Sequence, residues 1–80
     1  MDEIIRYDAV ITIHYKNFDS DVVISDEFTE DQFWNLYEYY NKIYGEQLDN
    51  NISYNDESEE WGTFAEDDQT EITFDVIEFG

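Results

Sequence analysis

The sequence predicts a small α+β domain, in which one helix packs on one face of an antiparallel β-sheet. Three observations favour this fold class. Apolar and polar residues alternate near both ends of the chain, which is the period-two pattern of half-buried strands. A helical apolar stripe with a capping sequence before it lies in the middle. With 80 residues, we expect a single domain spanning residues 1–80, with the element order ββαββ or ββαβββ.

The first strand is expected at residues 4–15, where every odd position from Ile5 to Tyr15 is apolar and most even positions are polar. The odd positions therefore form its core face. Residues 16–20 are a polar link of hairpin length, and residues 21–25 form a second, shorter strand. We expect these two strands to pair antiparallel.

The clearest local pattern is a helix start at Thr29. Its hydroxyl can accept a hydrogen bond from the backbone of Gln32, whose side chain can reach back, as in a capping box. Phe28 and Phe33 flank the cap as a hydrophobic staple. Apolar residues then recur at helical spacing, at Phe33, Leu36, Tyr37, Tyr40, Ile43 and Tyr44. Gly45 is expected to end the helix.

The second half of the chain contains three further strand candidates. Residues 52–54 and 61–65 are short and weakly patterned. The last strand is clearer, because Ile72, Phe74 and Val76 alternate with polar residues. The apolar pattern then shifts to Ile77 and Phe79, which predicts either a bulge or a strand end that is covered on both faces.

The chain is extremely acidic, with 22 Asp and Glu, three Lys and Arg, and a net charge of −19. Charge of this size is typical of disordered chains. The absence of Pro, the 19% aromatic content and the ordered apolar pattern favour a folded domain instead. All three bases, Arg6, Lys16 and Lys42, precede residue 43. Uncompensated negative charge is therefore densest in the second half.

Two groups of residues are candidate contacts for a partner. Carboxylates can pair with Lys and Arg as phosphate oxygens do, and Trp is favoured at binding hot spots. The first group contains Asp56, Glu57, Glu59, Glu60, Trp61, Glu66, Asp67, Asp68, Glu71 and Asp75. The second group, around the helix start, contains Asp26, Glu27, Glu30, Asp31 and Trp34. The alternative for each tryptophan is burial in a thin core, and the alternative for the acids is a solvated face.

Several function classes lack the residues that they need. There is no Cys, one His and three Gly, so disulfides, cysteine nucleophiles and a Gly-rich phosphate loop are excluded. Residues 49–56 offer oxygen ligands but lack the central Gly of a calcium-binding EF-hand loop. We therefore expect no enzyme activity, cofactor or specific metal site. An acidic N-terminus and the lack of a long apolar run favour a soluble, cytoplasmic protein that does not bind membranes.

The size of the charge is comparable to that of DNA. A compact chain of this length would be roughly 30 Å across, and 30 Å of duplex carries about 18 charges. In size, charge and aromatic content, the chain resembles the DNA-mimic proteins of phages and mobile elements. The resemblance covers the composition of the whole chain and includes no motif. It implies an inhibitor that occupies the nucleic-acid site of a basic target, such as a CRISPR effector or a restriction enzyme.

Two alternatives rest on the same physical properties. The chain can be an acidic binding module or chaperone for a basic protein, without competition against nucleic acid. It can also be an immunity or antitoxin protein that neutralises a single basic nuclease. All three hypotheses predict a basic protein partner, no direct binding to nucleic acid, and a monomer or homodimer.

Overall fold

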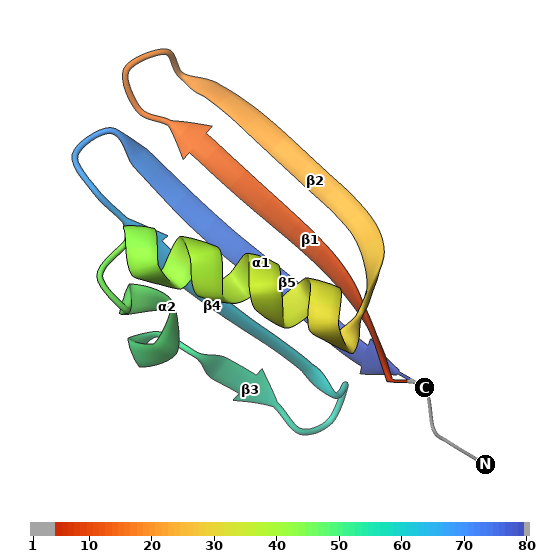
Figure 1. Ribbon diagram of the computed structural model, residues 1–80. Helices are drawn as coiled ribbons and strands as arrows, with labels where there is room; N and C mark the ends of the chain where they lie inside the picture. Colours follow the sequence, from red (N-terminus) through yellow and green to blue (C-terminus); the bar gives the residue numbers. More distant parts are fainter. Residues whose placement is uncertain (1–4, 80) are drawn as a thin grey trace.

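The computed structural model describes residues 5–79 (Figure 1). Within this range, five strands form one antiparallel sheet in the order β2-β1-β5-β4-β3. In chain order the elements are β1 (Arg6–Tyr15), β2 (Ser20–Thr29), α1 (Glu30–Ile43), α2 (Gln47–Asn50), β3 (Ser53–Asn55), β4 (Glu60–Glu66) and β5 (Thr70–Phe79). The predicted α+β class is confirmed, with the ββαβββ order and α2 as an addition. Ile4, the predicted start of the first strand, lies outside the described residues.

Strand β1 lies at the centre of the longest part of the sheet, because it pairs along its whole length with both β2 and β5. β2 is twice as long as predicted and runs directly into the helix cap. The register between β1 and β5 is uninterrupted from Arg6–Phe79 to Tyr15–Thr70. The predicted bulge near Ile77 is therefore wrong. The alternative, a strand end covered on both faces, is wrong as well, because Ile77 and Phe79 point away from the helix and are 39% and 42% exposed.

The predicted start and end of α1 are confirmed. The Gln32 backbone N–H donates to Thr29 Oγ1 at 3.3 Å, and the Thr29 N–H donates to Gln32 Oε1 at 3.2 Å. At the other end Gly45 has φ +66°, a conformation that costs little only for glycine. The helix thus begins and ends where its local sequence requires.

The apolar stripe of α1 is only partly buried. Its buried line consists of Phe33, Tyr37, Asn41 and Tyr44, while Ile43 is 54% exposed. The prediction that Ile43 packs in the core is wrong. Residues three or four apart share a face of a helix, so the face that contains Phe33 and Tyr37 continues to Asn41, and Ile43 lies outside it. The Asn41 amide is satisfied by Asp49, its Nδ2 lying 2.9 Å from Asp49 Oδ2.

The core lies between α1 and the sheet. Its fully buried side chains include Phe33, Phe74, Ile11, Leu48, Ile72 and Val76. Leu48 comes from α2, a four-residue helix whose carbonyl at Leu48 accepts a hydrogen bond from Thr63 of β4. Both helices therefore lie on the same side of the sheet, and within residues 5–79 the opposite side carries no helix (Figure 1).

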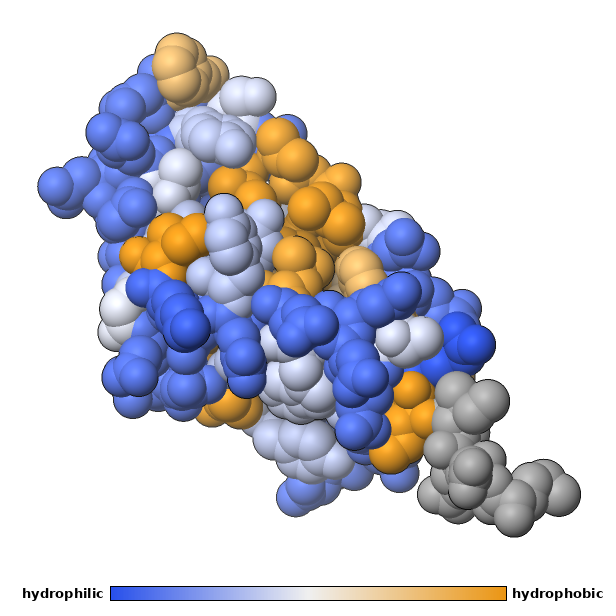
Figure 2. Space-filling view, in the orientation of Figure 1, coloured by the Kyte–Doolittle hydropathy of each residue, from blue (hydrophilic) through white to orange (hydrophobic). Residues whose placement is uncertain are grey.

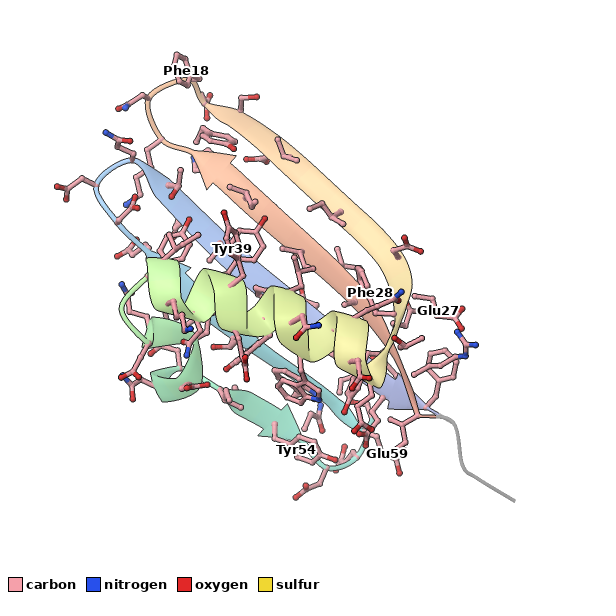
Figure 3. All side chains as sticks on the ribbon, in the orientation of Figure 1. Phe18, Glu27, Phe28, Tyr39, Tyr54 and Glu59 are labelled. Atoms are coloured by element: carbon pink, nitrogen blue, oxygen red, sulfur yellow. The ribbon has the colours of Figure 1, made fainter. Side chains whose placement is uncertain are left out.

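The molecule is elongated, with extents of 48 × 21 × 21 Å. Figure 2 shows the helix side, where apolar side chains gather between α1 and the β1–β2 hairpin and acidic and polar side chains surround them. At the tip of that hairpin Phe18 is 79% exposed (Figure 3). No helix in the described residues is long and apolar enough to cross a membrane.

Candidate functional site

The side of the sheet that faces away from α1 is the candidate functional site, and we call it the open face. It consists of the alternate strand residues that do not point into the core. These are Arg6, Asp8, Val10, Thr12 and His14 of β1; Asp21, Val23, Ser25 and Glu27 of β2; Ser53 and Asn55 of β3; Glu60, Gly62, Phe64 and Glu66 of β4; and Glu71, Thr73, Asp75, Ile77 and Phe79 of β5. The strand register brings acids from four different strands onto this one surface.

The antiparallel register places acids directly opposite one another on the open face. Glu66 of β4 faces Glu71 of β5, and Asp8 of β1 faces Glu27 of β2. Like charges in directly opposed positions destabilise a sheet. The open face therefore carries its negative charge at some expense of folding stability.

Basic side chains contact acids only at the margins of the open face. Arg6 Nη1 lies 3.7 Å from Glu27 Oε1, His14 Nδ1 contacts Asp21 Oδ1, and Lys16 Nζ lies 3.3 Å from Glu66 Oε2. Four acids of the face, Asp8, Glu60, Glu71 and Asp75, form no ion pair within residues 5–79. These four carboxylates are exposed and are available to a basic partner.

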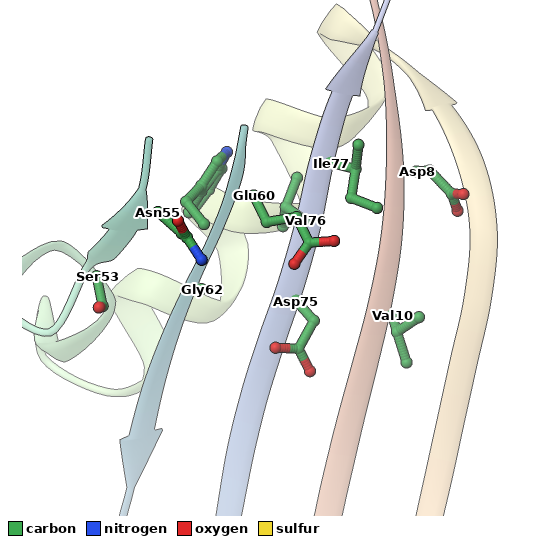
Figure 4. A pocket seen from close by; sticks show the side chains of 10 residues that line it. Asp8, Val10, Ser53, Asn55, Glu60, Gly62, Asp75, Val76 and Ile77 are labelled. Atoms are coloured by element: carbon green, nitrogen blue, oxygen red, sulfur yellow. The ribbon is translucent and has the colours of Figure 1, made fainter. Parts of the chain in front are cut away.

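A hollow of about 460 Å³ lies in the open face, and Gly62 forms part of it (Figure 4). A Cβ atom at this position would lie 2.8 Å from the Phe74 carbonyl oxygen, so only glycine fits the observed strand pairing. The carboxylates of Asp8, Glu60 and Asp75 line the hollow together with apolar groups such as Ile77. An apolar floor with carboxylates around it suits the stem and charged end of a Lys or Arg side chain.

The structure divides the first predicted group of acids among several places. Glu60, Glu66, Glu71 and Asp75 lie on the open face. The other acids lie in the turns at opposite ends of β4, with Asp56, Glu57 and Glu59 before the strand and Asp67 and Asp68 after it. A seven-residue strand separates the two turns by roughly 20 Å. The group is therefore continuous in sequence but does not form one patch.

The second predicted group is divided as well. Glu27 belongs to the open face, whereas Asp26 points to the helix side of the same strand, opposite Ala9. Glu30 and Asp31 lie in the first turn of α1, where they interact favourably with the helix dipole. Sequence reasoning missed two acids of the open face, Asp8 and Asp21. Their position on the polar side of the β1–β2 hairpin is the pattern that could have identified them.

Asp67 has a structural role. Its Oδ1 accepts hydrogen bonds from the backbone N–H groups of Gln69 at 2.8 Å and Thr70 at 2.7 Å. Because these hydrogen bonds favour the ionised form, they lower the pKa of the Asp67 carboxyl. The Oδ1 atom of this carboxylate therefore holds the β4–β5 turn.

The two tryptophans lie on the helix side and not on the open face. Trp34 is 37% exposed, and Trp61 is half-buried against the core. Their rings stack with centroids 6.0 Å apart and an interplanar angle of 13°. Tyr39, which also lies off the apolar stripe of α1, is 61% exposed.

Comparison of the chain with protein-family models, curated proteins and solved structures finds no match. Within residues 5–79, no group of three acidic or histidine side chains is arranged to hold a metal ion.

Proposed function

We propose that this chain is an acidic mimic of nucleic acid, which binds the basic surface that a target protein uses to hold DNA or RNA and so blocks it. The observation that carries the proposal is the open face, with seven carboxylates of which four have no basic partner in the described residues. Carboxylate oxygens accept hydrogen bonds from Lys and Arg as phosphate oxygens do. A paired sheet holds these groups in place before binding.

The amount of charge supports a binding role over mere solubility. A net charge of magnitude about 2–8 keeps a small domain soluble, and this chain carries −19. The excess charge weakens the fold through self-repulsion. The opposed pairs Glu66–Glu71 and Asp8–Glu27 concentrate this repulsion on the open face. A basic partner surface would relieve it.

The shape of the molecule changes the comparison with DNA. The chain is 48 Å long rather than the 30 Å expected for a compact sphere, and 48 Å of duplex carries about 28 charges. The net charge of −19 is therefore about two thirds of the duplex value over the same length. The mimicry proposed here is of a charged track of lower density than DNA, not of equal charge.

The spacing of the acids suits flexible basic side chains. Neighbouring strands lie about 5 Å apart, and residues two apart on one strand are separated by roughly 7 Å. Lys and Arg side chains that follow a phosphate backbone can adjust over such distances. Association should be fast and should weaken steeply with salt, because the field of the protein steers the encounter. The encounter would take place in the cytoplasm, where the proposed class of target protein acts.

Comparative affinity capture tests this proposal. The baits are the natural chain, an open-face variant with Asp8→Asn, Glu60→Gln, Glu71→Gln and Asp75→Asn, and a control variant with Asp19→Asn, Glu38→Gln, Glu46→Gln and Asp68→Asn. Both variants lose four charges, but the control loses them from turns and the helix side. We expect the natural chain and the control to retain the same basic nucleic-acid-binding protein from a nuclease-treated host lysate.

The two variants separate a specific face from net charge. The open-face variant should bind the retained protein at least about ten-fold more weakly, chiefly through a slower association rate. The control should stay within about two-fold of the natural chain. Equal loss in both variants would contradict the assignment of the open face, because binding would then depend on total charge alone.

A further inference from the structure

A second hollow lies on the helix side of the sheet, away from the open face. Its volume is about 250 Å³, and it lies between the first half of α1 and the β3–β4 hairpin. Its lining consists of four aromatic side chains and two carboxylates: Tyr7, Trp34, Tyr54, Trp61, Glu59 and Glu78. Figure 3 shows Tyr54 and Glu59 beside the turn of that hairpin. We call this hollow the aromatic cage.

The tryptophans of the cage are held rigidly. Phe33, fully buried, contacts Trp34 and Trp61 edge-on with ring centroids 4.9 and 5.7 Å apart. Tyr37 meets both rings edge-on as well, at 5.2 and 6.1 Å. Tyr54 on the edge strand is 59% exposed. A fixed aromatic wall that is open to solvent at one side is suited to receive a ligand without rearrangement.

Hydrogen bonds fix one carboxylate of the cage relative to the rings. Trp34 Nε1 donates to the Tyr7 hydroxyl at 3.3 Å, and this hydroxyl donates to Glu78 Oε1 at 3.0 Å. The Tyr7 phenol is a donor at neutral pH, and burial raises its pKa further above the ordinary value. The indole of Trp34, the phenol and the Glu78 carboxylate therefore form one connected unit.

The second carboxylate comes from a strained backbone position. Glu59 has φ +56° at the end of the β3–β4 turn. Gly or Asn adopts this left-handed conformation more readily than a residue with a longer side chain. The Glu59 carboxylate supplies a second acceptor at the cage.

We propose that the aromatic cage binds the guanidinium group of an arginine side chain on the partner protein. A cation lies favourably over the face of Trp or Tyr, and the two carboxylates complement its charge and exclude anionic ligands. Arginine fits better than lysine, because its planar group stacks on an aromatic ring and pairs with a carboxylate in a fork-like manner. The cage volume of about 250 Å³ is smaller than the roughly 300–1,000 Å³ of pockets that bind drug-sized molecules, and it suits a single side chain.

The cage is a separate site from the open face, although the inference that its arginine belongs to a partner protein rests on the proposed function. It lies on the opposite side of the sheet from the open face, because Trp61 and Glu78 point toward the helices whereas Glu60 and Ile77 point away. Either site can fail its test while the other passes. If both are correct, the partner holds the molecule by its two faces near the β3–β4 hairpin.

Titration with a small arginine analogue tests the cage directly. The probe is N-acetyl-arginine methylamide, and the readout is the chemical shift of the two indole N–H groups. We expect saturable binding at millimolar concentrations with shifts at both tryptophans. The neutral isostere N-acetyl-citrulline methylamide should produce no saturable shift, and N-acetyl-lysine methylamide should bind at least about five-fold more weakly. Equal binding of either analogue would overturn the assignment.

Matched variants locate the binding. Glu59→Gln and Glu78→Gln should each weaken the arginine analogue at least about three-fold, and the amide oxygen introduced by Glu78→Gln can still accept the hydrogen bond from the Tyr7 hydroxyl. Asp19→Asn, in the β1–β2 turn at the other end of the sheet and on neither proposed surface, removes the same charge and should leave the affinity unchanged. In a folded Trp34→Leu variant, the arginine analogue should no longer shift the signal of the Trp61 indole N–H. An equal effect of Asp19→Asn would show binding to net charge and would overturn the proposal.

Discussion

Neutralising Glu71 should stabilise the protein, although Glu71 belongs to the proposed binding surface. Glu71 faces Glu66 directly across the β4–β5 pair. Two charges about 6 Å apart in water repel by about 0.7 kcal/mol, which lies within the range of roughly 0.2–1 kcal/mol for opposed side-chain pairs. Glu71→Gln removes this repulsion and keeps the shape of the side chain. We expect the free energy of unfolding to rise by about 0.2–1 kcal/mol.

Glu66→Gln is the matched comparison on the other strand. It relieves the same repulsion but also loses the ion pair with Lys16, whose Nζ lies 3.3 Å from Glu66 Oε2. A surface ion pair contributes about 0.2–1 kcal/mol, so the two effects should nearly cancel. Urea unfolding at pH 8 in about 10 mM salt measures both variants. In 1 M salt, where the Debye length falls to about 3 Å, the gain from Glu71→Gln should shrink. Destabilisation by Glu71→Gln, or a gain that salt does not change, would refute the reasoning.

Three further predictions concern the fold that supports both sites. Gly62→Ala would bring a Cβ within 2.8 Å of the Phe74 carbonyl oxygen and should cost about 1–3 kcal/mol in urea unfolding; an unchanged midpoint would contradict the close approach. Phe33→Ala empties the centre of the aromatic core and should cost about 3–5 kcal/mol, measured in the same way; a loss below about 1 kcal/mol would contradict its central place. Burial, the largest cause, raises the pKa values of Tyr37 and Tyr40, so the fold favours the neutral phenols. Their contribution to the free energy of unfolding is therefore fully present below pH 10, and above pH 10 it falls by up to about 1.4 kcal/mol per pH unit for each phenol. A thermal midpoint that stays constant from pH 9 to pH 11 would contradict this expected loss.

Features of the fold that depend on neighbouring residues were predictable from the sequence. The capping box at Thr29 and Gln32 needs only residues three apart, and Gly45 ends α1 through its own backbone freedom. The alternation in β1 and β5 is also local, and it identified the buried faces of both strands. These elements are therefore confirmed by the structure.

Features that depend on distant pairing were not predictable. β2 continues through Asp26 and Glu27 because it pairs with β1 along the whole length of that strand. These two consecutive acids interrupt the alternation of apolar and polar residues, so the sequence did not indicate a strand there. The shift of apolar residues at Ile77 looked like a bulge, but the ladder with β1 holds the register there. Helix α2 is only four residues long, and Leu48 within it is buried by tertiary contacts. Such contacts leave no periodic pattern in the sequence.

The candidate site was predictable in its chemistry but not in its arrangement. The acidic residues and the two tryptophans were identified from composition. Which of them share a surface depends on strand order, and this order places Asp8 of β1 near Asp75 of β5 while sending Trp61 to the other side. The aromatic cage depends further on how α1 crosses the sheet, because Trp34 meets Trp61 only in the folded state.

The central claim is that the open face occupies the place of nucleic acid on a basic protein. The most direct measurement is a competition experiment, in which the captured partner is first saturated with its labelled DNA or RNA and then titrated with this chain. The account predicts that the natural chain and the control variant release the nucleic acid. The open-face variant should be at least about ten-fold less effective as a competitor. A stable ternary complex, in which the partner holds this chain and its nucleic acid together, would contradict the account.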